Sequence, residues 1–466
     1  DSRQVQEGTL FVCISGAHVD AHSFIPNAAR AGARAVLTER KTLEVPAGIA
    51  VLHVPDMQAA LDIIVPYFYD YPARSMRIIG ITGTNGKTTT SYLVRAILRH
   101  AGRRVGLIGT IQIMMEDDVF STANTTPDVI VMQQLLAEMR TRGMDAVVME
   151  VSSHALDQGR VAGIEFDTAV FTNLTQDHLD YHKTMENYAR AKARLFDLVS
   201  EQGVKEGKTA ILNADDAAAK TMRAHTHCPL ITYGVDMPAD LTARKIRLGQ
   251  DGMELTIAYA GAELPAVQTG ITGLFNVYNV LAAAGAALAE QVPASDITAA
   301  LAAFSGVPGR FELVRAGQDF SVIVDYAHTP DGMENVLRTA RAVTTGRIIT
   351  VFGCGGDRDR TKRPIMGRIA AELGDVIVLT SDNPRTEDPA AILDEVEAGV
   401  LPAIGGKPYE KLVDRRTAIF HAVQTARAGD TVVILGKGHE TYQILKDGTI
   451  HFDDRETAAE AIRSRQ

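Results

Sequence analysis

The stretch Arg77-IIGITGTNGKTTTSYLVRAIL-Arg99 decides the fold around it, because an apolar run gives way to a glycine loop and then to a helical pattern. In such a loop the backbone N–H groups surround phosphate oxygens, while Lys87 adds charge and the Thr88 hydroxyl can hold Mg²⁺ at a helix start. The spacing is a variant, because Ile81 stands where the first glycine of the common loop lies. A structural turn could also collect glycines, but Gly-Lys-Thr-Thr between a strand and a helix favours nucleoside triphosphate binding.

Length and composition narrow the class of protein. The 466 residues are too many for one core and predict about three domains. A net charge of −10 argues against a general nucleic-acid binder. No apolar run is long enough for a membrane span, so we expect a cytoplasmic protein without membrane insertion. The three cysteines are far apart and form no CxxC pair, which supports neither a disulfide framework nor a thiolate zinc site.

Three regions differ in pattern, and all are of the α/β class. Residues 1–75 show short apolar runs and one helical stretch near 25–31, which predicts a small α/β module. Because the chain starts at Asp1 without methionine, we expect this module to be truncated at its start. Residues 76–308 alternate strand and helix patterns around a parallel sheet, with a β-rich insert at 241–269. After the glycines at 306 and 309, residues 309–466 predict a doubly wound, Rossmann-like domain.

Polar residues follow two predicted strands of the central region. Glu150 ends one of them, and an acidic partner for the phosphate loop favours Mg²⁺ binding over a capping or ion-pairing carboxylate. The segment from Asp177 to His182 holds two aspartates and two histidines. His178 could bind Mg²⁺, a surface cluster is the alternative, and a zinc protease is disfavoured because no HExxH motif is present. By pattern alone, Lys192 lies in a basic helix on a solvated face.

Four predicted strands of the last region also end in polar loops, which favours a second ligand pocket facing the phosphate loop. Arginine there can grip a carboxylate bidentately, while Asp and Asn can accept from an ammonium group, as an amino-acid site requires. A plain Asn-Pro turn is the alternative for the third loop. We expect Cys354 to be a small buried residue. The candidate residues are Asp325, His328, Arg358, Asp382, Asn383, Arg385, Gly436 and Glu440.

Together these motifs resemble those of the Mur ligases of bacterial cell-wall synthesis, in particular the members that add the third amino acid. The resemblance spans nearly the whole chain, and the motifs that carry it occur in a fixed order. They are Asp1-Ser-Arg, Gly83-TNGKTT, Asn124-TTP, Glu150-VSSHAL, Asp177-HLDYH, Asp325-YAHTP, Gly353-CGGDRD, Asp382-NPR and Gly436-KGHE.

The resemblance implies three domains: residues 1–75 for the UDP end of the substrate, 76–308 for ATP and 309–466 for the amino acid. It also implies a role for each matching residue. ATP would be held by Gly83, Thr84, Asn85, Gly86, Lys87, Thr88, Thr89, Asn276, Arg310 and Asp325. The UDP-muramoyl dipeptide would be held by Ser2, Ala17, His18, Val19, Asn124, Thr125, Thr126, Ser152, Gln158 and Arg160. The amino acid would be held by Arg358, Asp382, Asn383, Pro384, Arg385, Gly436 and Glu440.

Further implied roles concern catalysis and the metal. Lys87, Lys192 and His178 would be catalytic, and Mg²⁺ would be held by Thr88, Glu150, His178 and Lys192. Lys192 would be carbamylated, which reverses the interpretation from pattern alone, since a carbamate is a two-oxygen anion.

The implied activity is an ATP-dependent amide ligase that adds meso-diaminopimelate to UDP-N-acetylmuramoyl-L-alanyl-D-glutamate through an acyl phosphate. The Asp-Asn-Pro-Arg form favours diaminopimelate over lysine, because lysine would leave a buried arginine unpaired. A monomer using Mg²⁺ and small-molecule substrates is expected. The alternatives are a lysine-adding or D-alanyl-D-alanine-adding sibling, folylpolyglutamate synthase, and a non-catalytic P-loop regulator.

Overall fold

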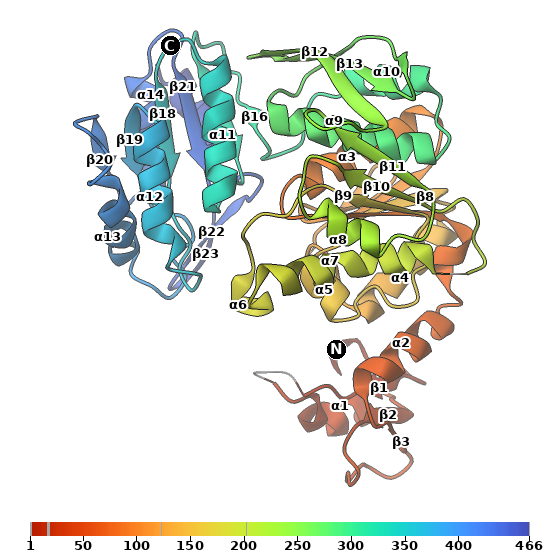
Figure 1. Ribbon diagram of the computed structural model, residues 1–466. Coiled ribbons are helices and arrows are strands. Elements are labelled where there is room, and N and C mark those ends of the chain that lie inside the picture. The colour runs from red at the N-terminus through yellow and green to blue at the C-terminus, as the bar shows by residue number, and fades with distance from the viewer. Residues whose placement is uncertain (1, 16–18, 123, 202, 466) are drawn as a thin grey trace.

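The computed structural model describes residues 2–15, 19–122, 124–201 and 203–465. In these ranges the strands form a three-stranded, a twelve-stranded and a six-stranded sheet, together with a two-stranded ribbon. Each large sheet carries its own helices, and the three bodies follow one another along the chain (Figure 1). Among the residues described, no helix is long and apolar enough to cross a membrane.

The N-terminal body, at the bottom of Figure 1, is a parallel sheet of β1 (Leu10–Val12), β2 (Ala35–Thr38) and β3 (Ala50–His53) with helices α1 (Ile25–Arg30) and α2 (Met57–Phe68). Short 3-10 turns lie at Ser2–Gln4, Ala21–Phe24 and Pro72–Ser75. The predicted helical stretch near 25–31 is confirmed as α1, whereas α2 was not predicted. The pattern of α2 hides its helical period, because Ile63, Tyr67 and Phe68 are exposed apolar side chains and Pro66 lies within the helix.

The central body is built on a sheet in the order β14-β13-β12-β11-β10-β9-β4-β8-β5-β6-β7, with β15 paired to β13. The strands that form the parallel part from β12 to β5 have buried apolar cores. Helices α3, α9 and α10 pack on one face, and α4 and α7 pack on the other. The predicted β-rich insert is confirmed as β12 to β15.

The strands of this body are β4 (Arg77–Thr82), β5 (Val105–Ile108), β6 (Ile113–Met115), β7 (Asp118–Phe120), β8 (Ala146–Glu150), β9 (Thr168–Phe171), β10 (Thr209–Asn213), β11 (Leu230–Gly234), β12 (Leu241–Gly249), β13 (Gly252–Tyr259), β14 (Ala262–Glu263) and β15 (Val267–Thr269). The helices are α3 (Lys87–His100), α4 (Val129–Thr141), α5 (Ser153–Asp157), α6 (Leu179–His182), α7 (Met185–Ser200), α8 (Ala219–Ala224), α9 (Leu274–Ala289) and α10 (Ala294–Ala303).

The C-terminal body, drawn in blue in Figure 1, has the strand order β16-β17-β21-β18-β19-β20, parallel except for β16. Helices α11 to α13 cover one face, and α14 and α15 cover the other. The predicted doubly wound arrangement is confirmed. The four strands that end in polar loops, β17, β21, β18 and β19, are direct neighbours, so their loops meet at one edge.

The strands of the C-terminal body are β16 (Glu312–Leu313), β17 (Ser321–Asp325), β18 (Ile348–Phe352), β19 (Val376–Leu379), β20 (Tyr409–Lys411), β21 (Thr431–Leu435), β22 (Tyr442–Leu445) and β23 (Gly448–His451). The helices are α11 (Pro330–Val343), α12 (Lys362–Leu373), α13 (Pro389–Val400), α14 (Arg415–Thr425) and α15 (Asp454–Arg463).

Candidate active site

The phosphate loop leaves β4, which lies between β8 and β9 in the sheet, and enters α3. Two of its glycines cannot be replaced without a clash. A Cβ on Gly83, whose φ is 149°, would lie 1.8 Å from the Thr172 hydroxyl, and one on Gly86, whose φ is 86°, would lie 2.4 Å from Asn279 Oδ1. The loop is therefore fixed between the residues that follow β9 and helix α9.

Two lysines converge on one carbonyl of this loop. Lys87 Nζ donates to Gly83 O at 2.9 Å and to Thr84 O at 2.7 Å, and Lys192 Nζ donates to the same Gly83 O at 2.7 Å. Lys192, on α7, is only 1% exposed and packs over the Tyr188 ring. The interpretation of Lys192 as a solvated residue was therefore wrong, because its side chain is buried against the phosphate loop.

Burial lowers the pKa of Lys192 well below its usual value, the Lys87 charge lowers it further, and Asp177 opposes both only in part. Burial also lowers the pKa of Lys87. A neutral lysine amine is a nucleophile and the form that adds CO₂. The direction of the Lys192 pKa shift thus favours the neutral form that carbamate formation requires.

Thr88 and Glu150 supply the oxygen atoms that Mg²⁺ prefers. Thr88 Oγ1 donates to Glu150 Oε2 at 3.0 Å, and Glu150 is 1% exposed. Oxygens at adjacent corners of an octahedral Mg²⁺ site, about 2.1 Å from the ion, lie about 3 Å apart, so this pair fits the ion. In the part of the chain that is described, no three His, Cys, Asp or Glu side chains gather into a metal site. Mg²⁺ commonly completes its shell with water and phosphate oxygens.

His178 lies near the two lysines of the phosphate loop, in the left-handed conformation with φ 53°. Its ring contacts those of His154 and Tyr188, and its Nε2 lies 3.4 Å from Asp177 Oδ2. Burial lowers the pKa of His178 to about 4; the Asp177 charge opposes this shift, while His154 and Lys87 add to it. The imidazole is therefore neutral and able to act as a ligand or acceptor near neutral pH.

Beside Glu150 lies a connected group of the residues expected to bind the peptide. Thr126 Oγ1 donates to Glu150 O at 2.8 Å and accepts from Ser152 N at 3.1 Å. Arg160 donates to Thr126 O at 3.0 Å and to Gln158 Oε1 at 2.7 Å. Thr125 Oγ1 lies 3.0 Å from Thr110 Oγ1, and the backbone N–H of Thr110 donates to Glu150 Oε1.

The remaining residues expected to bind this substrate lie at or near the surface. Asn124 is exposed, Ser2 begins the first 3-10 turn, and Val19 is 58% exposed. Ala17 and His18 fall outside the described residues.

Arg310 joins the C-terminal body to the phosphate loop. Its Nη2 donates to Thr88 Oγ1 at 3.3 Å, and its guanidinium lies 4.5 Å from the centroid of the Tyr326 ring. Both oxygens of Asp325 accept backbone bonds, from Phe311 N and Ala327 N, each at 2.7 Å. Asp325 therefore shapes the backbone around Arg310, while burial raises its pKa.

Asn276 reaches the loop indirectly. Asn279 Nδ2 donates to Asn276 Oδ1 at 2.9 Å, and Asn279 Oδ1 accepts from Thr90 in α3. Asn279 is thus a contact of the loop helix that the sequence did not single out.

The candidate amino-acid pocket is gathered where β21, β18 and β19 end. A Cβ on Gly436 would lie 2.4 Å from Asp382 Oδ2. Asn383 Nδ2 donates to Glu440 Oε2 at 2.9 Å, and Arg385 Nη1 donates to Gly356 O at 2.8 Å. Pro384 is buried beside them, whereas Arg358 is exposed and donates to Asp357 O. The structure therefore brings all but Arg358 into one packed group.

Two buried cations support this pocket, and sequence reasoning missed both. Lys437 is fully buried, and its Nζ donates to Glu440 Oε2 at 2.9 Å and to Asn383 Oδ1 at 3.2 Å. Arg415 pairs with Asp454 and donates to the carbonyls of Ser381 and Leu435, where two of the strands end. The motif Gly436-KGHE contained a signal for Lys437, but Arg415 looks like an ordinary surface residue in the sequence.

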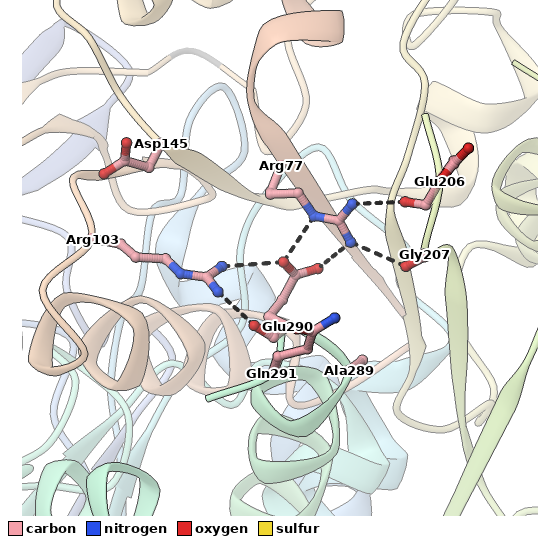
Figure 2. A pocket seen from close by; sticks show the side chains of 8 residues that line it. All are labelled: Arg77, Arg103, Asp145, Glu206, Gly207, Ala289, Glu290 and Gln291. Atoms are coloured by element: carbon pink, nitrogen blue, oxygen red, sulfur yellow. Dashed lines mark hydrogen bonds and ion pairs between the residues drawn. The ribbon is translucent and has the colours of Figure 1, made fainter. Parts of the chain in front are cut away.

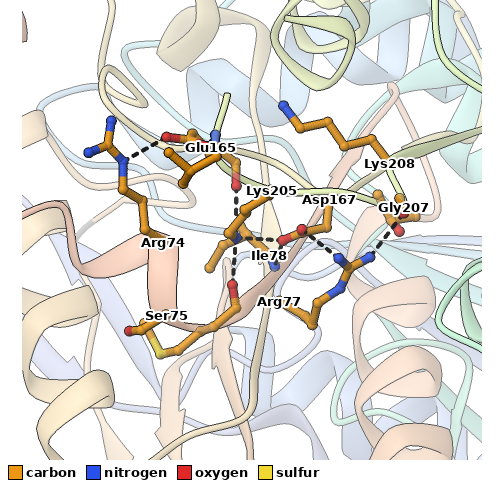
Figure 3. Close-up of polar contacts among 12 residues, drawn as sticks. Arg74, Ser75, Arg77, Ile78, Glu165, Asp167, Lys205, Gly207 and Lys208 are labelled. Atoms are coloured by element: carbon orange, nitrogen blue, oxygen red, sulfur yellow. Dashed lines mark hydrogen bonds and ion pairs between the residues drawn. The ribbon is translucent and has the colours of Figure 1, made fainter. Parts of the chain in front are cut away.

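A cavity of about 670 Å³ lies at the opposite edge of the central sheet, where β4 begins (Figure 2). Three of its charged groups pair with one another: Glu290 accepts from Arg77 at 2.9 Å and from Arg103 at 3.2 Å. Arg77 and Lys205 also hold the buried Asp167, at 2.8 and 2.6 Å (Figure 3). We interpret this network as structural, because its ionic groups satisfy each other.

Known proteins resemble this chain along its whole length. Family models match residues 1–71 (Mur ligase family, catalytic domain), 81–287 (Mur ligase middle domain) and 309–438 (Mur ligase, glutamate ligase domain). The chain is 48% identical to UDP-N-acetylmuramoyl-L-alanyl-D-glutamate--2,6-diaminopimelate ligase of Bacillus cereus, over 100% of this chain and 93% of that protein.

The ligase of the same name from Bacillus licheniformis is 49% identical over 99% of this chain and 93% of that protein. A solved structure that bears this ligase name is 34% identical, with a TM-score of 0.70 over 100% of this chain and 94% of that chain.

Proposed function

The chain belongs to the Mur ligase family, and from that premise we propose that it adds meso-diaminopimelate to UDP-N-acetylmuramoyl-L-alanyl-D-glutamate with the use of ATP. It is an ADP-forming acid–amino-acid ligase of peptidoglycan precursor synthesis. Membership of this family argues against a non-catalytic P-loop regulator.

The observation that carries the proposal is a hydrogen bond between the C-terminal body and the phosphate loop of the central body. Arg310, from the body that holds the candidate amino-acid pocket, donates to Thr88 of the phosphate loop. A ligase that forms an acyl phosphate must bring the phosphoryl group and the amine together, and a cross-domain arginine can stabilise charge on the transferring group. We propose that residues 76–308 bind ATP, 309–466 bind the amino acid and 1–75 bind the UDP end.

In the proposed reaction, the side-chain carboxylate of the D-glutamyl residue attacks the γ-phosphorus of ATP, which gives an acyl phosphate and releases ADP. The neutral amine of diaminopimelate then attacks the acyl carbon, phosphate leaves, and the nitrogen loses a proton to the leaving phosphate or to water. Lys87 and Arg310 would hold the phosphoryl oxygens, while Thr126, Ser152 and Arg160 would position the peptide. Asp382 and Glu440 would receive the ammonium group, and Arg385 would hold the distal carboxylate.

Mg²⁺ fits the pair formed by Thr88 and Glu150, and it would neutralise phosphate charge there. A carbamate on Lys192 would add an anion beside the same loop. His178, which is neutral, would contribute a nitrogen next to these oxygens. We further infer a cytoplasmic monomer, since its substrates are nucleotides and a free amino acid.

The test is an ADP-release assay with UDP-N-acetylmuramoyl-L-alanyl-D-glutamate and either meso-diaminopimelate or L-lysine. We expect kcat/KM for diaminopimelate to exceed that for lysine by at least 100-fold, because lysine would leave Arg385 unpaired. Preference for lysine would assign the chain to the lysine-adding siblings instead. No stimulation of ATP turnover by any amino acid would refute the ligase proposal.

A further inference from the structure

Asp331 is a carboxylate of the C-terminal body that reaches into the central body. It is the second residue of α11, whose start is capped by the Thr329 side chain bonding Gly332 N. Its Oδ2 accepts from Asn85 Nδ2 at 2.6 Å and from Thr175 Oγ1 at 3.0 Å. These partners precede it by 246 and 156 residues, so only the tertiary fold brings them together.

The two partners belong to loops that are already tied to each other. Asn85 Nδ2 also lies 3.3 Å from Thr175 Oγ1, and Thr175 N donates to Thr84 Oγ1 at 3.1 Å. Asn85 N donates to Asn173 Oδ1 at 2.9 Å. The phosphate loop and the loop after β9 therefore form one unit, and Asp331 binds that unit where its two parts meet.

The position of Asp331 differs from that of the groups expected to touch phosphate. Lys87, Thr88 and Arg310 lie on the side of the loop near Glu150, as their mutual contacts and charges indicate. Asp331 instead holds the side chain of Asn85, which lies in the middle of the loop. A carboxylate on two neutral donors makes charge-assisted hydrogen bonds, which are stronger than neutral ones.

We propose that Asp331 is a positioning residue that docks the amino-acid-binding body onto the phosphate loop through Asn85 and Thr175. The inference rests on the proposed ligase function, in which the acyl phosphate and the amine must meet across this junction. Asp331 acts with the Arg310–Thr88 contact, so that the two bodies are held at two points of one loop.

The experiment compares Asp331→Ala and Asp331→Asn in the full chain. Glu334→Ala is the matched control, because Glu334 lies one turn further along α11 and pairs with Arg338 of the same helix. Small-angle X-ray scattering without nucleotide reports the arrangement of the bodies, and steady-state ADP release reports the reaction.

We expect Asp331→Ala to increase the radius of gyration and to lower kcat by about 10- to 100-fold, since misplaced reactants lose the benefit of orientation. KM for ATP should change less than threefold, because ATP binds the central body. Asp331→Asn should retain most of the activity and the compact scattering curve, because its amide oxygen can accept from both partners. Thr175→Val, which removes one donor from the other side, should loosen the junction in the same direction.

Scattering identical to that of the wild type in Asp331→Ala and Thr175→Val, with kcat within twofold of Glu334→Ala, would overturn the proposal. So would an equal loss of melting temperature in Asp331→Ala and Asp331→Asn without any change in scattering, because that outcome indicates a purely local structural role. If the wild-type protein shows no ligase activity, the proposed function fails, while the scattering comparison still decides the docking role.

Discussion

Replacement of Lys192 tests how a buried amine serves the phosphate loop. Lys192→Met keeps an unbranched side chain of similar volume and removes the amine, so the packing against Tyr188 is largely retained. Lys192→Ala removes the packing as well. Comparison of the two variants separates loss of the functional group from loss of core volume.

The expected loss of rate follows from the distance between the two lysine amines, both of which donate to the carbonyl of Gly83. Lys192 Nζ and Lys87 Nζ lie 2.7 and 2.9 Å from Gly83 O, so the two amines are at most 5.6 Å apart, the sum of these distances. Unit charges at that spacing interact by about 3 kcal/mol at an effective dielectric constant of about 20. A carbamate would therefore favour the charged form of Lys87 by about 3 kcal/mol. Because the transferring phosphoryl group needs Lys87 as an ammonium, we expect Lys192→Met to lower kcat by about 100-fold, the factor to which about 3 kcal/mol corresponds.

The assay is the initial rate of ADP release at saturating substrates, with melting temperature measured in parallel. Arg190→Met is the control, because Arg190 is an exposed basic residue of the same helix. Short carboxylates such as formate should restore part of the Lys192→Ala activity, since they can replace the missing anion. ¹³C-labelled bicarbonate should give a carbamate resonance in the wild type and none in Lys192→Met. Activity of Lys192→Met equal to that of Arg190→Met would refute this reasoning.

Three further outcomes are expected. Arg385→Ala should raise KM for diaminopimelate by about 100-fold while KM for ATP stays within threefold, as steady-state kinetics will show; equal effects on both would place Arg385 outside the pocket. Gly436→Ala should lower the free energy of unfolding by about 1–3 kcal/mol and weaken amino-acid binding, because the φ of Gly436 is 115° and the added Cβ would meet Asp382. Gly405→Ala is the control, since Gly405 has φ 57° and no neighbour within 4 Å of its Cβ. Equal losses of both variants in denaturant titrations would show that the contact with Asp382 does not matter. Burial opposes ionisation of Glu290, but hydrogen bonds and charge from Arg77, Thr168 and Arg103 outweigh burial and hold the Glu290 pKa below its usual value. The ionised carboxylate therefore stabilises the fold above about pH 4.5, and this contribution is lost as pH falls through the lower folded pKa. Glu290→Gln should lose stability at pH 7 and show a smaller further loss on acidification than the wild type, and an unchanged pH profile of stability in urea titrations would contradict the assignment.

Strands that are buried on both faces were predictable almost to the residue. β4, β10, β17 and β21 each contain a continuous apolar run between polar residues, and such a run can satisfy its backbone only inside a sheet. β3 was not singled out although it holds the short apolar run Ala50-Val-Leu, and all four of its residues are exposed. The phosphate loop was predictable for a different reason: its glycines, lysine and threonine are contiguous, so their chemistry does not depend on distant parts of the chain.

Residues whose role depends on a distant partner could not be found in this way. Lys192 has the pattern of a solvated helix residue. In the fold, however, its amine is buried and donates to the carbonyl of Gly83, which is 109 residues away in sequence. Arg415 supports two strand ends that are separate in sequence. The resemblance to a family supplied a role for Lys192, but it supplied none for Asp331, Lys437 or Arg415.

The sequence by itself determined the local chemistry of this protein: a phosphate loop, a set of polar strand ends and a doubly wound C-terminal sheet. These follow from contiguous residues and from the periodicity of apolar side chains. Only the tertiary structure decided that Arg310 and Asp331 reach the same phosphate loop, and that Lys192 loses its solvent. The physical reason is that desolvation and hydrogen bonding depend on which atoms meet in space. Contacts between residues that are 109 to 246 positions apart produce no periodic pattern in the sequence from which they could be recognised.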